Sequence, residues 1–115
     1  MSTAPEHRST HESESDERNQ SLKVYLNGQI VPREQALVSV YDAGFMLGDG
    51  IWEGIRLYNG KWAFVQDHVD RLYESARVVD MDIPLTREQM IEALDQTAAA
   101  NQMTQDVHAR LMITR

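Results

Sequence analysis

The amino-acid sequence predicts an α+β fold in which an antiparallel sheet carries two helices on one face. Two Asn-Gly pairs, at 27–28 and 59–60, each separate short apolar runs, which is the pattern of a tight β-hairpin. Between residues 67 and 100, apolar side chains recur at helical spacing in two successive stretches. Because most strands precede the helices rather than alternate with them, the sheet is expected to be antiparallel.

The folded part is expected to begin at Leu22 and to form one domain over residues 22–115. Residues 1–21 are predicted to be a disordered acidic tail. Residues 1–20 contain almost no apolar side chain, and five acids against two arginines give them a net charge of −3. Such a segment buries too little apolar surface to offset the entropy of ordering.

Several short strands are expected to build the sheet. Pro32 ends the first hairpin, because proline lacks the N–H that a strand ladder needs. Residues 42–50, which are rich in glycine, are expected to form a loop. The predicted strands cover residues 23–31 (interrupted by the first turn), 36–41 (a strand or an extended segment), 51–58, 61–65 and 107–114.

Two helices are expected between the second hairpin and the last strand. Asp67 is a suitable N-cap for the first, which is predicted to end near Val79. Thr86 and Gln89 have the spacing of a capping box, so they predict a second helix over residues 87–100. Asn101 is expected to end this helix.

Composition and charge exclude several classes of function. A net charge of −7 over 115 residues argues against a nucleic-acid partner, because phosphate binding needs a basic face. There is no cysteine, which excludes disulfides, cysteine metal ligands and cysteine nucleophiles. No apolar run reaches the roughly 20 residues of a membrane span, and no signal peptide is recognised, so the cytoplasm is the expected compartment. His68 has no partner at ligand spacing, so no metal site is predicted.

The most distinctive segment is the glycine-rich run Gly48-Asp-Gly-Ile-Trp-Glu-Gly54. Its spacing is G-x-G-x-x-x-G and a strand is predicted to follow. It therefore differs from the dinucleotide-binding pattern G-x-G-x-x-G, which opens a helix. The absence of Gly-Lys-Ser/Thr excludes a P-loop. Taken alone, the run is either a tight turn that uses the conformational freedom of glycine or a place where the backbone approaches a ligand.

Four side chains are candidates for binding. Arg71 either pairs with Asp67, four residues earlier on the helix, or grips an anion such as phosphate with two N–H groups. His108 and Arg110 lie two apart on a predicted strand, so they share a face that is either solvent-facing or suited to a carboxylate. Trp52 is either a core residue or the wall of a pocket.

Taken together, these segments resemble the N-terminal domain of the class IV (fold type IV) pyridoxal-phosphate enzymes. This family contains branched-chain and D-amino-acid aminotransferases, (R)-selective amine transaminases and aminodeoxychorismate lyase. The resemblance extends over residues 24–115 and rests on the order and spacing of five segments. They are Gly48-Asp-Gly-Ile-Trp-Glu-Gly-Ile-Arg56, Tyr58-Asn-Gly60, His68-Val-Asp-Arg-Leu-Tyr-Glu-Ser-Ala76, Ile83-Pro84 and the strand from His108 to Arg115.

The resemblance implies roles for five side chains. Arg71 matches the arginine that binds the phosphate of pyridoxal 5′-phosphate. Trp52 and Leu47 match positions that wall the pocket for the substrate side chain. His108 stands where branched-chain enzymes usually carry tyrosine, and Arg110 matches their arginine near the carboxylate of an acidic substrate. His108 and Trp52, which replaces a phenylalanine, bear on substrate preference and stereochemistry.

The catalytic lysine of this family has no counterpart in the chain. Aminotransfer needs a lysine that holds the cofactor as a Schiff base and moves the Cα proton. The two lysines present, Lys23 and Lys61, lie in the predicted hairpins, whereas the resemblance places the catalytic lysine in a larger C-terminal domain. We therefore expect the chain to be part of a larger enzyme and to have no transaminase activity by itself.

For the whole enzyme, the resemblance implies transfer of an amino group from a hydrophobic, branched-chain amino acid to a 2-oxo acid such as 2-oxoglutarate. D-amino-acid or (R)-amine transamination and lyase chemistry are alternatives on the same scaffold. A non-catalytic binding module is a further alternative, because the lysine is lacking. A homodimer or higher homo-oligomer is also implied, with no nucleic-acid or membrane partner.

Overall fold

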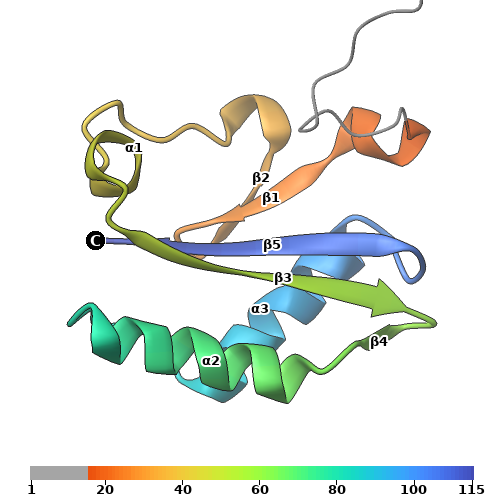
Figure 1. Ribbon diagram of the computed structural model, residues 1–115. Helices are drawn as coiled ribbons and strands as arrows, with labels where there is room; N and C mark the ends of the chain where they lie inside the picture. Colours follow the sequence, from red (N-terminus) through yellow and green to blue (C-terminus); the bar gives the residue numbers. More distant parts are fainter. Residues whose placement is uncertain (1–15) are drawn as a thin grey trace, which may run out of the picture.

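The computed structural model describes residues 16–115, which form an α+β domain (Figure 1). A three-stranded antiparallel sheet has the strand order β4-β3-β5, and a separate hairpin is formed by β1 and β2. The predicted fold class is therefore confirmed. The elements are the 3₁₀ helix η1 (Glu17–Ser21), β1 (Lys23–Leu26), β2 (Gln29–Pro32), η2 (Arg33–Gln35), α1 (Ala43–Leu47), β3 (Gly50–Tyr58), β4 (Lys61–Trp62), α2 (Val65–Val78), α3 (Arg87–Ala100) and β5 (Val107–Thr114).

Both Asn-Gly pairs form the predicted hairpin turns. Asn27 and Asn59 each have a φ of 51°, and the glycines that follow have φ values of 88° and 73°. Two successive residues at positive φ are the requirement of a type I′ turn, whose twist matches that of the flanking strands. The strand after the second turn is shorter than predicted, because the chain leaves the sheet after Trp62 and enters α2.

The long strands β3 and β5 pair along nearly their whole length, from Gly50 opposite Thr114 to Leu57 opposite Val107. Buried and exposed residues alternate along most of β3, so one face of the sheet is buried and the other is exposed to solvent. The buried face packs against α2 and α3, which lie together on one side of the sheet in Figure 1. The core consists of Ile51, Ile55, Leu72, Ala76, Met81, Met90, Leu94 and Leu111.

The second predicted helix is confirmed, and the start of the first is corrected. Thr86 accepts from the backbone N–H of Gln89 and the Gln89 side chain accepts in return, which completes the predicted capping box of α3. α2 begins at Val65, after Phe64 at a φ of 54°, so Asp67 lies inside the first turn and is not the N-cap. No helix among residues 16–115 is long and apolar enough to cross a bilayer.

For residues 36–50, the strand alternative at 36–41 and the expected loop at 42–50 were wrong. Residues 36–41 form no strand and instead run as irregular, largely exposed chain. The expected loop at 42–50 contains the five-residue helix α1. Asp42 caps the start of this helix by accepting from Gly44 N at 2.9 Å, and Gly48 ends it at a φ of 67°. Thr114, at the end of β5, donates to the same Asp42 carboxylate at 2.9 Å, which ties α1 to the sheet.

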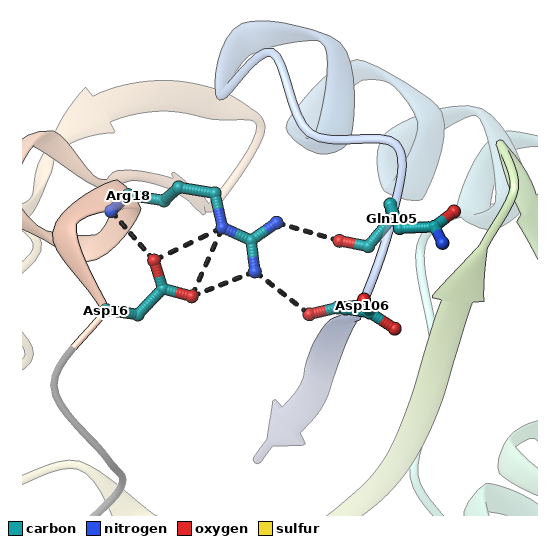
Figure 2. A network of polar contacts seen from close by, with 4 residues as sticks. All are labelled: Asp16, Arg18, Gln105 and Asp106. Atoms are coloured by element: carbon teal, nitrogen blue, oxygen red, sulfur yellow. Dashed lines mark hydrogen bonds and ion pairs between the residues drawn. The ribbon is translucent and has the colours of Figure 1, made fainter.

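Residues 17–21, which fall within the predicted tail, form the 3₁₀ helix η1, and Arg18 fastens this helix to the loop before β5 (Figure 2). Its guanidinium donates to the carbonyl oxygens of Gln105 at 2.7 Å and Asp106 at 3.1 Å, while Asp16 accepts from its other N–H groups. These bonds supply order that the composition of this polar segment does not indicate. The rest of the predicted acidic tail, residues 1–15, lies outside the described residues.

Candidate functional site

The exposed face of the sheet brings together three of the five predicted site residues. Trp52 and Arg110 come from adjacent strands, and the Arg110 guanidinium carbon lies 4.3 Å from the centroid of the Trp52 ring. This is the geometry of a cation–π contact, which is worth roughly 0.5–1 kcal/mol at an exposed site. His108 lies two residues from Arg110 on the same face, as predicted. Trp52 is 55% exposed, which excludes the core role considered for it.

Gly54 makes room for this group of side chains. A Cβ atom at this position would lie 2.7 Å from Cε1 and Nε2 of His108 and 3.7 Å from the Trp52 ring. The His108 imidazole therefore lies across the bare backbone of β3, beside Trp52. This glycine is required for close packing of a side chain, since its φ is not in the left-handed region.

Leu47 lies apart from this group, on the last turn of α1. It is 78% exposed, and α1 is attached to the sheet where Gly50 pairs with Thr114. Trp52 follows two residues later on β3 and pairs with Met112. The structure thus places Leu47 near the end of the sheet that carries Trp52, with its side chain open to solvent.

Arg71 lies on the other side of the sheet, on α2. Its Nε donates to Glu53 Oε1 at 2.6 Å and its Nη2 donates to Glu53 Oε2 at 2.7 Å, a bidentate ion pair. The alternative pairing of Arg71 with Asp67 is not the one observed. The side chain is 66% exposed, and it lines a depression together with Phe64, Asp67 and His68.

Glu53 is the buried centre of this second group. It is only 4% exposed, although its neighbours on the inner face of β3 are apolar. The Arg71 guanidinium holds the pKa of Glu53 well below its usual value, at about 2, against the opposing effect of burial. His68 contributes further, with Nδ1 2.8 Å from Glu53 Oε2. The same ion pair raises the pKa of Arg71.

Sequence reasoning missed Glu53. The signal was a carboxylate at an inward position of an otherwise apolar strand, where an unpaired charge would be costly. Such a position demands a cationic partner, and α2 supplies it. In residues 16–115 no group of three or more metal-binding side chains is present.

The fold and these two groups of side chains agree with a known class of proteins. Residues 50–115 match the family model described as Amino-transferase class IV. This match covers more than half of the chain, and the chain therefore belongs to the class IV aminotransferase family. The match contains β3, α2, α3 and β5, and hence Trp52, Arg71, His108 and Arg110.

Similar proteins come from two groups within the family. A Methanocaldococcus jannaschii protein, provisionally named a branched-chain-amino-acid aminotransferase, is 46% identical over 94 residues, which are 82% of this chain and 32% of that protein. D-alanine aminotransferase of Listeria monocytogenes is 42% identical over 95 residues, which are 82% of this chain and 32% of the enzyme. The chain thus spans about a third of the length of these relatives.

A solved structure confirms the architecture. The T.th. branched-chain amino acid aminotransferase, complexed with N-(5′-phosphopyridoxyl)-L-glutamate, superposes with a TM-score of 0.76 at 29% identity. The superposition covers 83% of this chain and 33% of that enzyme. The sheet and helices seen here therefore correspond to one domain-sized part of a larger aminotransferase fold.

Proposed function

We propose that this chain forms the smaller, N-terminal domain of a pyridoxal 5′-phosphate-dependent transaminase. The enzyme would move an amino group from a hydrophobic, branched-chain amino acid to a 2-oxo acid such as 2-oxoglutarate. The observation that carries the proposal is the family match over residues 50–115, because it contains four of the five candidate site residues. A homodimeric or higher assembly and a cytoplasmic location belong to the same proposal.

The side chains around Arg71 suit the cofactor. When bound, pyridoxal phosphate supplies an electron-accepting ring for chemistry at the amino-acid Cα. Glu53 occupies the edge of the guanidinium formed by Nε and Nη2. The edge formed by Nη1 and the second N–H of Nη2 faces away from that carboxylate and matches a phosphate in the same bidentate way. The exposure of Arg71 leaves this edge accessible.

The exposed face of the sheet would receive the substrate. Trp52 offers a flat apolar wall and Leu47 a second one, which suits a hydrophobic side chain. His108 and Arg110 present hydrogen-bond donors on the same face and would orient a substrate carboxylate. The stacking of Arg110 on Trp52 restrains the guanidinium at the edge of the proposed pocket.

A D-amino acid is the second candidate substrate. The similarity to D-alanine aminotransferase of Listeria monocytogenes favours this alternative, and His108 departs from the tyrosine of branched-chain enzymes. (R)-amine transamination and lyase chemistry remain further alternatives on the same scaffold.

The test is a spectrum and a donor panel on the complete protein that the gene encodes. We expect an absorbance band of bound pyridoxal phosphate that shifts when an amino donor is added. L-leucine, D-alanine and an (R)-amine, each with 2-oxoglutarate as acceptor, separate the candidate reactions. A protein that binds no cofactor would instead support a non-catalytic binding module.

The role of Arg71 is tested by Arg71→Ala in the same protein. Removal of the guanidinium should weaken retention of pyridoxal phosphate during dialysis. Unchanged retention would show that the phosphate is held by other groups.

A further inference from the structure

We propose that Glu53 is a positioning residue that fixes the Arg71 guanidinium for the cofactor phosphate. This inference rests on the proposed function, since it takes Arg71 as the phosphate ligand. It assigns a role to a buried carboxylate that does not itself face the substrate side of the sheet.

The geometry of the ion pair is the first argument. An arginine side chain on a helix surface has many rotamers, and ordering it costs conformational entropy. Two bonds to one carboxylate, at 2.6 and 2.7 Å, fix both the position and the plane of the guanidinium. With Nε and Nη2 held in this way, the direction of the remaining edge is set before any ligand arrives.

The rigidity of Glu53 is the second argument. Glu53 lies on β3, between the buried residues Ile51 and Ile55 on the same face. His68, one turn before Arg71 on α2, reaches Oε2 from the side. The carboxylate is therefore held by the sheet and by a second side chain, and a ligand held through such supported groups is bound more tightly.

The position of the pair on the sheet is the third argument. β4 pairs only with Leu57 and Tyr58 of β3, so in the described chain residues 50–55 of β3 pair with β5 alone. The Arg71 guanidinium lies above this strand and remains 66% exposed. A ligand can therefore reach the outer edge of Arg71 while the inner edge stays bound to Glu53.

The test compares two ligands, pyridoxal 5′-phosphate and pyridoxal, which lacks the phosphate. Dissociation constants are measured by absorbance titration of the complete protein and of its Glu53→Gln variant. We expect Glu53→Gln to weaken pyridoxal phosphate binding about tenfold, comparable to the loss when a residue that supports a metal ligand is removed. Pyridoxal binding should be unchanged, because it does not use Arg71. Equal weakening of both ligands would overturn the inference, since it would indicate general damage to the site.

Further variants separate this inference from the proposed function. In an Arg71→Ala background, Glu53→Gln should cause no additional loss, because Glu53 acts through Arg71. If Arg71→Ala weakens pyridoxal phosphate but Glu53→Gln does not, the positioning role is wrong and the phosphate role stands. If Arg71→Ala itself has no effect, the phosphate role fails, and the inference fails with it.

One control tests whether the effect is specific to Glu53, and a second variant covers the case in which Glu53→Gln does not fold. Asp70→Asn removes another carboxylate of α2 that pairs with an arginine, Arg87, and it should leave both constants unchanged. If Glu53→Gln does not fold, as judged by far-UV circular dichroism, Glu53→Asp replaces it. This variant keeps the charge but is one methylene shorter, so it should still weaken pyridoxal phosphate more than pyridoxal. If Glu53→Asp changes the affinities for pyridoxal phosphate and pyridoxal by the same factor, the inference is overturned here too.

Discussion

At the scale of single residues, the contact between Gly54 and His108 determines how the exposed face of the sheet is shaped. The imidazole lies where a Cβ atom of residue 54 would be, so the two positions depend on each other. His108 is a solvent-exposed side chain and can move away at little cost. A change at Gly54 should therefore affect the geometry of the face more than the stability of the fold.

Under the proposed function, we predict that Gly54→Ala changes the KM of the proposed transaminase for its amino-acid substrate while costing less than about 1 kcal/mol of stability. The added methyl group displaces the His108 ring. The measurement is steady-state kinetics beside chemical denaturation. In a His108→Ala background the same substitution should have little effect on KM, and an equal effect in both backgrounds would contradict the explanation.

Glu53 gives a second prediction at this scale, which concerns pH. Its pKa is about 2 in the folded protein against an ordinary value of 4.5, so the unfolded chain takes up this proton at higher pH. The stability that the group contributes is thus fully present above about pH 4.5 and is lost as the pH falls toward 2. The shift corresponds to roughly 3 kcal/mol. Solvent screening at the exposed Arg71 should reduce this contribution to about 1–2 kcal/mol.

The check is a set of urea unfolding curves between pH 2 and pH 7 for the protein and for Glu53→Gln. The variant should lack this part of the acid destabilisation, because glutamine does not titrate. Parallel pH profiles for the two proteins would show that the pKa of Glu53 is not shifted.

At the scale of elements, α1 depends on a close approach to the end of β5. Gly44 lies against the Thr114 side chain, and a Cβ atom here would overlap its Cγ2 methyl group. We predict that Gly44→Ala pushes α1 off the sheet and costs about 1–3 kcal/mol, as overpacking does elsewhere. The measurement is the denaturation midpoint.

The matched control is the double variant Gly44→Ala/Thr114→Ser. Serine keeps the hydroxyl group that donates to Asp42 but lacks the methyl group that meets the new Cβ. Most of the lost stability should return. A double variant as unstable as the single one would mean that the remaining contacts of the new Cβ, with Asp42 Oδ2 at 3.0 Å and the Cβ atom of residue 114 at 3.1 Å, cause the loss rather than the methyl group.

Local signals explain which elements the sequence could predict. The Asn-Gly turns and the Thr86–Gln89 capping box are formed by residues close together in the sequence, so they can be predicted from the sequence alone. The helix α1 has only five residues among glycines and no helical period to recognise. Asp67 is of a residue type that favours the N-cap, whereas the positive φ of Phe64, the actual N-cap of α2, has no sequence signature.

The candidate site also contains features that the sequence could predict and features that depend on contacts between distant residues. His108 and Arg110 share a face because strand side chains alternate, which holds without knowledge of any partner. The pairing of Arg71 with Glu53 joins residues 18 apart across a hairpin turn, and Asp67 offered a plausible partner nearer in the sequence. The stacking of Arg110 on Trp52 likewise depends on the register of β3 and β5, which the residues alone do not determine.

At the scale of the whole molecule, the described chain exposes many large apolar side chains on one continuous segment. They lie between η2 and the end of α1, where exposed fractions range from 57% to 81%, and comprise Leu37, Val38, Val40, Tyr41, Phe45, Met46 and Leu47. Exposed apolar surface on this scale is unusual for a monomeric soluble protein.

We predict that the isolated 115-residue chain binds a hydrophobic dye and self-associates as its concentration rises. Analytical ultracentrifugation with dye fluorescence measures both. The double variant Tyr41→Ser/Phe45→Ser should reduce both signals, because it removes two of the largest exposed side chains. A monodisperse chain without dye binding would show that this segment rearranges to bury its apolar groups.

The alternation of β3 also bears on how this protein can evolve. Positions 52 and 54 lie on the outward face of the strand, and the side chains at 51, 53, 55 and 57 are buried against the helices. Neighbouring positions of β3 therefore tolerate substitution differently. Changes at the outward positions leave the packed core intact and, under the proposed function, would alter ligand preference, whereas changes at the inward positions destabilise the fold. If the proposed function holds, a substitution library confined to 52, 54, 108, 110 and 112 would change substrate preference at little cost in stability. Insertion of a single residue in β3 would turn the buried side chains outward and the exposed ones inward beyond the insertion, and would therefore disrupt both the core and the exposed face.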